Sequence, residues 1–180
     1  WSSDVCSSDL ELKWKHQQET YKKMLEQLSK TKRVGYIYPT SCGKSFPVLK
    51  YLEENQDKRV LFLAPSIEII EQFKEYIQKY IMNNSSKSVK SQYKNWHFIT
   101  YQSLKRFNTK NVKVDIIISD ELHRTGGEVW GKEFDSLLEN NPDAYKIGIT
   151  ATPRRTDGKD MMDKYFEKDI VYEFSKKIGR

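Results

Sequence analysis

Short runs of almost wholly apolar residues recur along this chain, and amphipathic stretches separate them. The clearest runs are residues 59–64 and 114–119, in which apolar and β-branched side chains follow one another with little interruption. Strands that are covered on both faces have this composition. The stretches between them show helical spacing, as at Ile70, Phe73 and Ile77. The alternation predicts an α/β domain with a mostly parallel sheet and helices on both faces.

The same patterns give the expected elements. We expect strands over residues 33–38, 59–64, 96–100, 114–119, 144–149 and 170–174. We expect helices over residues 11–30, from about 43, from 66, over 130–138, and as a short turn over 102–107. In the first of these, Trp14, Tyr21, Met24, Leu25 and Leu28 lie at helical spacing, with Lys and Glu between them. Pro47 is tolerated in the first turn of its helix, and residues 83–95 read as a solvated loop.

The composition excludes several classes of protein. The 180 residues suffice for one core, and no apolar run approaches the roughly 20 residues of a membrane helix. No secretory signal is visible. The two cysteines, Cys6 and Cys42, lie too far apart to indicate a disulfide framework or a zinc site, so we expect a cytoplasmic protein. The net charge of +6 favours a polyanionic partner, although an AT-rich coding sequence produces the same lysine-rich composition.

A first polar cluster follows residues 33–38 and reads Pro39, Thr40, Ser41, Cys42, Gly43, Lys44, Ser45. A phosphate-binding loop needs inward-pointing backbone N–H groups, a helix N-terminus and a lysine. We expect residues 40–45 to bind the phosphates of ATP, with Lys44 on the outer phosphates and Ser45 on Mg²⁺. Tyr38 stands where the strict pattern has its first glycine. Taken alone, the cluster also admits a chance Gly-Lys-Ser.

A second cluster, residues 120–123, follows the strand predicted at 114–119. Adjacent carboxylates at a strand end can divide two roles, so we assign Asp120 to Mg²⁺, partly through water, and Glu121 to the base that activates water. Taken alone, a surface acid pair is the alternative. No second His or Cys lies near His123, so we expect it to be a hydrogen-bonding relay beside the γ-phosphate.

A third cluster contains Thr150 and Thr152, which flank an alanine and precede Pro153. Their hydroxyls are expected to bond to residues 120–123, and ordinary turn chemistry at a strand end is the alternative. Ligands collect at the carboxyl ends of the strands in a parallel sheet. The three clusters are therefore expected to form one site.

These residues resemble the first RecA-like lobe of superfamily 2 helicases and translocases, in the branch with Asp-Glu-x-His boxes. The resemblance spans about residues 12–177 and implies a RecA-like P-loop NTPase lobe that uses ATP and Mg²⁺. Residues 39–45, 120–123 and 150–152 look like motifs I, II and III, although Ser41 replaces the usual glycine of motif I. Residues 123–126 are closest to the branch that includes the motor subunits of type I and type III restriction enzymes.

The resemblance also implies roles outside the three clusters. Gln17 would read the adenine, and residues 150–152 would couple hydrolysis to nucleic-acid binding. Backbone contacts to nucleic acid, DNA in preference to RNA, would come from Pro65, Ser66, Thr100, Tyr101 and Gln102. Such contacts carry no sequence specificity and depend strongly on salt. The aromatic rings of Trp96, Phe98 and Tyr101 are possible stacking platforms, but we expect Trp96 and Phe98 to alternate into the core.

Both ends of the chain look foreign to the rest. Residues 1–10 resemble the translation of a sequencing-library adapter, and residues 178–180 resemble an adapter from the other side. A genuine disordered N-terminus and a genuine tail are the alternatives. We expect an ATP-binding domain over residues 11–177, truncated at both ends, that lacks the second RecA-like lobe.

The missing lobe defines the expected partners and activity. In this family it supplies an arginine finger, so we expect the isolated chain to bind ATP weakly and hydrolyse it hardly at all. In the intact protein the second lobe would lie in cis, and a nuclease or modification subunit is a possible partner. The sequence admits two other functions: a non-catalytic nucleic-acid-binding or clamp module with the same fold, and a P-loop kinase or transferase.

Overall fold

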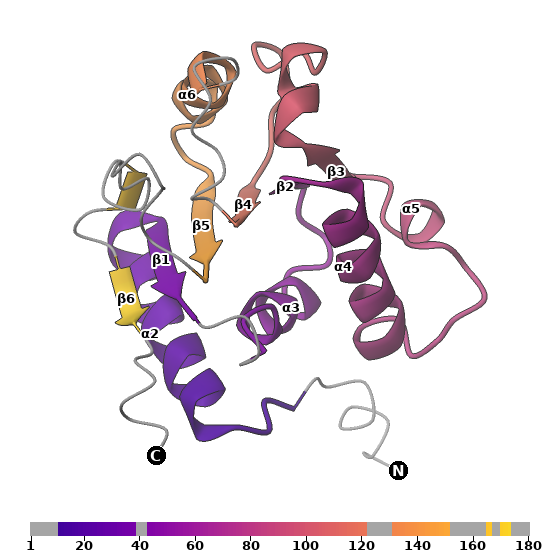
Figure 1. The fold of residues 1–180 in the computed structure, drawn as a ribbon, viewed down its shortest axis with the longest axis vertical. Helices are drawn as coiled ribbons and strands as arrows, with labels where there is room; N and C mark the ends of the chain where they lie inside the picture. The colour runs from indigo at the N-terminus through magenta and orange to yellow at the C-terminus, as the bar shows by residue number, and fades with distance from the viewer. Residues whose placement is uncertain (1–10, 39–42, 122–130, 152–164, 167–169, 174–180) are drawn as a thin grey trace.

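A six-stranded parallel sheet forms the centre of the molecule (Figure 1). The structure is a computed structural model that describes residues 11–38, 43–121, 131–151, 165–166 and 170–173. The strands are β1 (Arg33–Ile37), β2 (Val60–Ala64), β3 (Trp96–Thr100), β4 (Ile116–Asp120), β5 (Tyr145–Thr150) and β6 (Ile170–Glu173). Their order is β3-β2-β4-β5-β1-β6, and every pair of neighbours is parallel. The predicted fold class and the predicted strands are confirmed.

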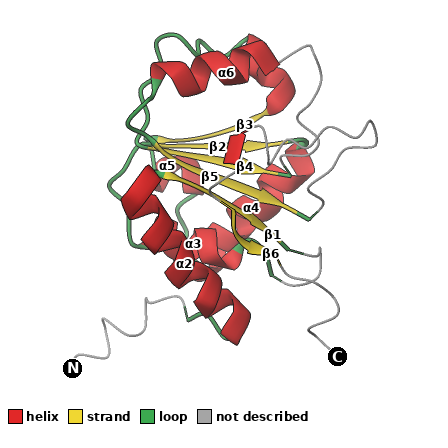
Figure 2. Ribbon diagram, turned by 90° about the vertical axis from the view of Figure 1, so that its left-hand side faces the viewer, coloured by secondary structure: helices red, strands yellow, loops and turns green. Residues whose placement is uncertain are grey.

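Helices cover both faces of this sheet (Figure 2). They are α2 (Lys15–Thr31), α3 (Phe46–Glu53), α4 (Ile67–Tyr80), α5 (Val89–Gln92), the 3-10 helix η1 (Tyr101–Lys105) and α6 (Gly131–Asn140). One face packs against α2, α3, α4 and α5, and the other packs against η1 and α6. Within the described residues, no helix is both long and apolar enough to cross a lipid bilayer.

Strand alternation divides the core into two hydrophobic clusters. On β2, Phe62 points into the cluster under α4, where its ring stacks on Phe73 with 4.1 Å between centroids. Its neighbours Leu61 and Leu63 point into the cluster under α6. All three side chains are fully buried. Such continuous burial explains why β2 reads as an uninterrupted apolar run, because a strand with helices on both faces has no solvent-facing positions.

Two details of the helices differ from the sequence prediction. The helix expected from about residue 43 begins at Phe46, because Gly43 has a left-handed φ of 65° that cannot continue into a helix. Pro47 does fall in the first turn, as predicted. Residues 83–95 do not form a loop throughout, since they include α5 and bury Val89 and Tyr93.

The buried face of α2 includes only some of the apolar residues that lie at helical spacing. Trp14 and Leu25 are 49% and 39% exposed, so they do not belong to the core. The buried residues of the helix are Gln17, Thr20, Met24 and Leu28. Two of these four are polar, and apolar spacing alone cannot find a buried face that is partly polar.

Candidate active site

The predicted site residues converge at the carboxyl ends of three neighbouring strands. β5 lies between β1 and β4, so the segments that follow these strands meet at one edge of the sheet. The backbone N–H of Tyr38 donates to the Thr150 carbonyl at 2.9 Å, which holds the first segment against the third. Residues Thr40, Ser41, Cys42, His123 and Thr152 lie outside the described residues, so their predicted roles stay predictions.

Lys44 and the two adjacent carboxylates form the centre of the site. The Lys44 Nζ atom lies 3.3 Å from Asp120 Oδ1 and forms an ion pair with Glu121 Oε1. The side chains are only 13%, 5% and 10% exposed, in the order Lys44, Asp120, Glu121. Burial raises the pKa of Asp120, and Lys44 opposes that rise. One cation therefore balances two carboxylates in a region that is poorly accessible to water.

Gly43 and Gln17 connect the phosphate loop to α2. Gln17 is buried, and its Nε2 donates to the Gly43 carbonyl at 3.3 Å. A side chain at Gly43 would overlap Gln17 Nε2 and would also have to adopt the left-handed φ of 65°. This position therefore requires glycine. The contact brings Gln17 to the loop, and its role in reading adenine stays a prediction.

A buried tyrosine on β1 holds the backbone of this loop at Lys44. The hydroxyl of Tyr36, on β1, donates to the Lys44 carbonyl at 2.5 Å. Burial raises the pKa of Tyr36 well above its usual value, so the hydroxyl keeps its proton and remains a donor. The sequence analysis missed this residue, because a tyrosine in a buried strand looks like any other core aromatic.

The donor set that would hold Mg²⁺ consists of Ser45 and Asp120. Both offer oxygen atoms, which this ion prefers, and Mg²⁺ normally takes its remaining ligands from water and substrate phosphates. Ser45 is the N-cap of α3, yet its side chain makes no capping hydrogen bond. The described residues contain no group of three or more His, Cys, Asp or Glu side chains that could hold a metal without such help. The two residues thus fit an ion that arrives with a nucleotide.

The segments predicted to contact nucleic acid also follow the carboxyl ends of strands. These strands, β2 and β3, lie on the side of β4 away from β5. β2 and β3 pair in register, with Ala64 opposite Thr100, so Ser66 and Gln102 leave neighbouring strands at equivalent points. Ser66 caps α4, since its hydroxyl accepts from Ile69 N at 3.4 Å. Thr100 caps η1 and is mostly buried, whereas Gln102 is exposed.

Two predictions about aromatic residues have different outcomes. Trp96 is buried and Phe98 packs against the core, which confirms that they alternate inward. Tyr101 was wrongly predicted to contact nucleic acid through its side chain. Its ring is only 2% exposed, and its hydroxyl donates to the Asp120 carbonyl at 2.8 Å. The residue after a strand end can turn inward as easily as outward, and the sequence does not distinguish the two.

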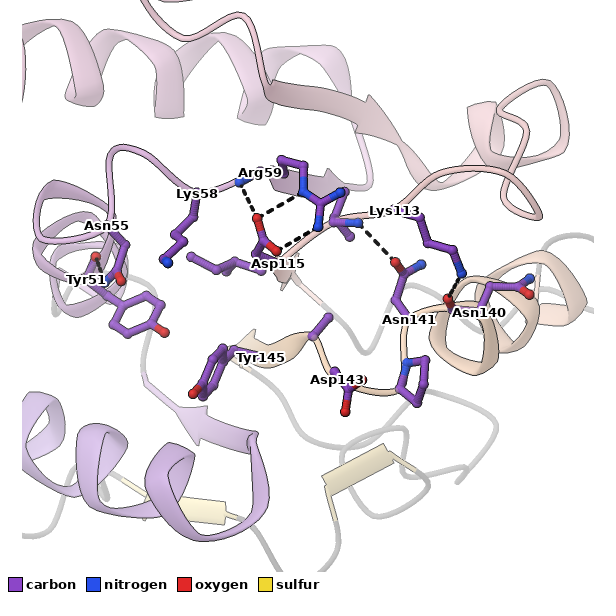
Figure 3. A pocket seen from close by; sticks show the side chains of 14 residues that line it. Tyr51, Asn55, Lys58, Arg59, Lys113, Asp115, Asn140, Asn141, Asp143 and Tyr145 are labelled. Atoms are coloured by element: carbon purple, nitrogen blue, oxygen red, sulfur yellow. Dashed lines mark hydrogen bonds and ion pairs between the residues drawn. The ribbon is translucent and has the colours of Figure 1, made fainter.

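A hollow of about 500 Å³ lies at the amino-terminal ends of the strands, where β2, β4 and β5 begin (Figure 3). Arg59 forms a two-pronged contact with Asp115 there, at 2.9 and 3.1 Å. Lys113 donates to the Asn140 carbonyl at 2.5 Å. Among the described residues, none of the predicted site residues lines this hollow. The first contact joins the segments that enter β2 and β4, and the second joins the segment before β4 to the end of α6.

Comparison with known proteins identifies the family. Residues 12–155 match the family described as the type III restriction enzyme, res subunit. The chain belongs to this family. The match and the relatives below make it a first RecA-like lobe of the superfamily 2 helicase type, near the type III restriction branch.

Two curated relatives extend the comparison. The chain is 33% identical over 153 residues to the DNA 3'-5' translocase XPB2 of Sulfurisphaera tokodaii, and the match covers 81% of this chain and 33% of the relative. It is 25% identical over 142 residues to the putative helicase 22 of a Sulfolobus islandicus filamentous virus, covering 68% of this chain and 25% of that protein. The chain therefore spans about a third or less of the length of these relatives.

Solved structures show the same fold. The helicase domain of Pyrococcus furiosus Hef superposes with a TM-score of 0.66 at 19% identity, over 95% of this chain and 39% of that one. The SWI2/SNF2 ATPase core of Sulfolobus solfataricus superposes with a TM-score of 0.62 at 19% identity, over 81% and 32%. At 19% identity these likenesses establish the RecA-like fold of this chain and nothing beyond the fold.

Proposed function

We propose that this chain is the ATP-binding lobe of a nucleic-acid-dependent ATPase, a helicase or translocase that acts on DNA. The observation that carries the proposal is the convergence of Lys44, Asp120 and Glu121 at the ends of β1 and β4. A lysine for the outer phosphates, a carboxylate for Mg²⁺ and a carboxylate that orients the attacking water are recurring parts of sites that transfer a phosphoryl group to water. The relative named as a DNA translocase supports DNA as the polymer.

Each of the three side chains has a distinct role in this reaction. The outer phosphates of ATP would attract Lys44 away from the carboxylates, because the triphosphate carries more charge than either of them. Asp120 and Ser45 would then hold Mg²⁺, which neutralises charge on the phosphates. Glu121 would accept a proton from the water that attacks the γ-phosphorus, and the bond to the β-phosphate oxygen would break to give ADP and phosphate.

Contacts to the DNA backbone would come from Ser66, Thr100 and Gln102. Hydroxyl and amide groups of this kind bind phosphates without reading bases, and β2 and β3 present the three residues next to one another. Thr150, at the end of β5 and beside the phosphate loop, would couple hydrolysis to this binding. A second lobe in cis would supply the arginine that stabilises the transferred phosphoryl group.

Two substitutions in the gene product that contains this chain test the proposal. Lys44→Ala should abolish binding of a fluorescent ATP analogue. Glu121→Gln should retain binding and lower steady-state hydrolysis by about 100-fold, because only the base is lost. Lys74→Ala is the matched control, since its pair with Glu71 is half exposed and far less buried than that of Lys44.

Hydrolysis should be measured with single-stranded DNA, duplex DNA and RNA, each at low and high salt. Stimulation by DNA that falls steeply with salt is the expected result. Undiminished turnover in Glu121→Gln would remove Glu121 as the base. Nucleotide binding without any hydrolysis in the presence of any of the three polymers would instead favour a non-catalytic clamp.

A further inference from the structure

Tyr101 connects the nucleic-acid segment to the carboxylate pair. It is the first residue of η1, between Thr100 and Gln102, and its ring points into the core while Gln102 faces solvent. Its hydroxyl passes the end of β2, which separates β3 from β4, and donates to the Asp120 carbonyl at 2.8 Å. One residue of the turn is therefore exposed while its neighbour holds the backbone of the candidate active site.

The carbonyl that Tyr101 holds belongs to the peptide between Asp120 and Glu121. The N–H of the same peptide donates to Asp120 Oδ1 at 2.8 Å, so both polar groups of this peptide are fixed. Glu121, which follows, has a φ of 51°. This left-handed conformation is unfavourable for a residue with a side chain and persists only where surrounding contacts impose it. The hydroxyl of Tyr101 is one of those contacts.

The Tyr101 ring itself has little freedom to move. It meets Phe134 of α6 edge to face, with 6.4 Å between centroids and 81° between planes. Phe134 in turn packs edge to face against Tyr165 at 4.8 Å. Because the ring is enclosed, a shift of η1 displaces the hydroxyl instead of being absorbed by rotation of the side chain.

We propose that Tyr101 is a positioning residue through which nucleic acid bound at residues 100–102 sets the orientation of the Glu121 carboxylate. This inference rests on the proposed function, in which Glu121 is the base that activates water and nucleic acid binds at the η1 turn. Loss of the hydroxyl leaves the Asp120 carbonyl buried without this donor. The peptide then keeps only its N–H contact to Asp120 Oδ1, so it is less firmly held and Glu121 is less constrained to its left-handed conformation.

The test is Tyr101→Phe in the gene product that contains this chain, which keeps the ring and removes only the hydroxyl. Tyr93→Phe is the matched control. Tyr93 is also a buried tyrosine whose hydroxyl donates a hydrogen bond, to Gln56 Oε1 at 2.7 Å, but it lies at the opposite edge of the sheet. Measurements are kcat and KM for ATP with and without single-stranded DNA, and the affinity for a non-hydrolysable ATP analogue as a check of folding.

The expected result is a kcat at saturating DNA about tenfold below wild type, with the KM for ATP and the analogue affinity within about twofold. The ratio of stimulated to unstimulated kcat should fall in Tyr101→Phe and stay constant in Tyr93→Phe. A wild-type ratio in Tyr101→Phe, together with inactive Glu121→Gln, would overturn the link and leave the proposed function standing. An equal fall in Tyr93→Phe would reduce Tyr101 to a general packing role and also overturn it. Absence of DNA-stimulated hydrolysis in the wild type would reject the proposed function itself.

Discussion

Replacing Lys44 by alanine should destabilise the folded chain even when no nucleotide is added. Lys44 is the cation that faces both Asp120 and Glu121, whose side chains are 5% and 10% exposed. Removing one partner of a buried ion pair leaves an uncompensated charge, which typically costs about 3–5 kcal/mol. Some water reaches all three side chains, so we expect about 3 kcal/mol at pH 8. This loss is a large part of the roughly 5–15 kcal/mol that stabilises a domain.

The size of this loss should depend on pH in a defined direction. Burial raises the pKa of Asp120, and Lys44 opposes the rise, so removal of Lys44 should raise that pKa further. A carboxyl group with a raised pKa in the folded chain stabilises the fold below its unfolded pKa of about 3.9 and loses that contribution as the pH rises through the folded value. In Lys44→Ala the pKa of Asp120 in the folded chain is higher than in wild type, so the stability of the variant goes on falling to a higher pH. The variant should therefore be most destabilised at pH 8 and should approach wild type near pH 4.

Urea unfolding of the chain at pH 4, 5, 6, 7 and 8 measures this difference. Trp96, which is buried at the start of β3, provides the fluorescence signal. Lys74→Ala is the control, because its ion pair with Glu71 is half exposed and pairs that water can reach contribute less than about 1 kcal/mol. A Lys44→Ala chain as stable as wild type at pH 8, or a deficit that stays constant down to pH 4, would refute the electrostatic argument.

Three further substitutions test packing and backbone geometry. Gly148→Ala should cost about 1–3 kcal/mol in urea unfolding, because a Cβ would lie 2.9 Å from Phe166 Cζ, and Phe166→Leu should recover part of the loss. Lys146→Met should cost about 1–3 kcal/mol in the same assay, since the Nζ atom donates to three backbone carbonyls between α6 and β5. Gly43→Ala should weaken binding of a fluorescent ATP analogue by at least tenfold, because alanine is strained at the left-handed φ and its methyl group would displace Gln17 Nε2. Wild-type behaviour in any of these variants would contradict the corresponding contact.

Most of the fold could be predicted because the sheet is buried on both faces. Continuous apolar runs such as residues 60–64 leave few alternatives to a central strand, and all six predicted strands appear within two residues of their expected ends. The helices were harder to predict in detail. Trp14 and Leu25 have apolar side chains at helical spacing, yet they face solvent, while Gln17 and Thr20 are buried by their contacts with the rest of the fold.

The residues of the candidate site also differ in how far the sequence predicts them. The convergence of Lys44, Asp120 and Glu121 could be predicted because their chemistry is unusual and each lies at or beyond the carboxyl end of a strand of the same parallel sheet. The roles of Tyr36 and Tyr101 could not. A tyrosine hydroxyl finds its partner through tertiary packing, and the carbonyl that it contacts has no signature in the sequence.

These two tyrosines explain how such a site is held together. Tyr36 belongs to the hydrophobic cluster on one face of the sheet and fixes the Lys44 carbonyl, whereas Tyr101 belongs to the cluster on the other face and fixes the Asp120 carbonyl. Each half of the core therefore anchors the backbone of one functional segment. Under the proposed function, a nucleotide that enters the site would draw Lys44 away from the two carboxylates while the backbone on either side of them stays fixed. A site held in this way, with its backbone anchored from both faces of the sheet and its charged side chains able to rearrange, suits the proposed cycle of nucleotide binding and hydrolysis.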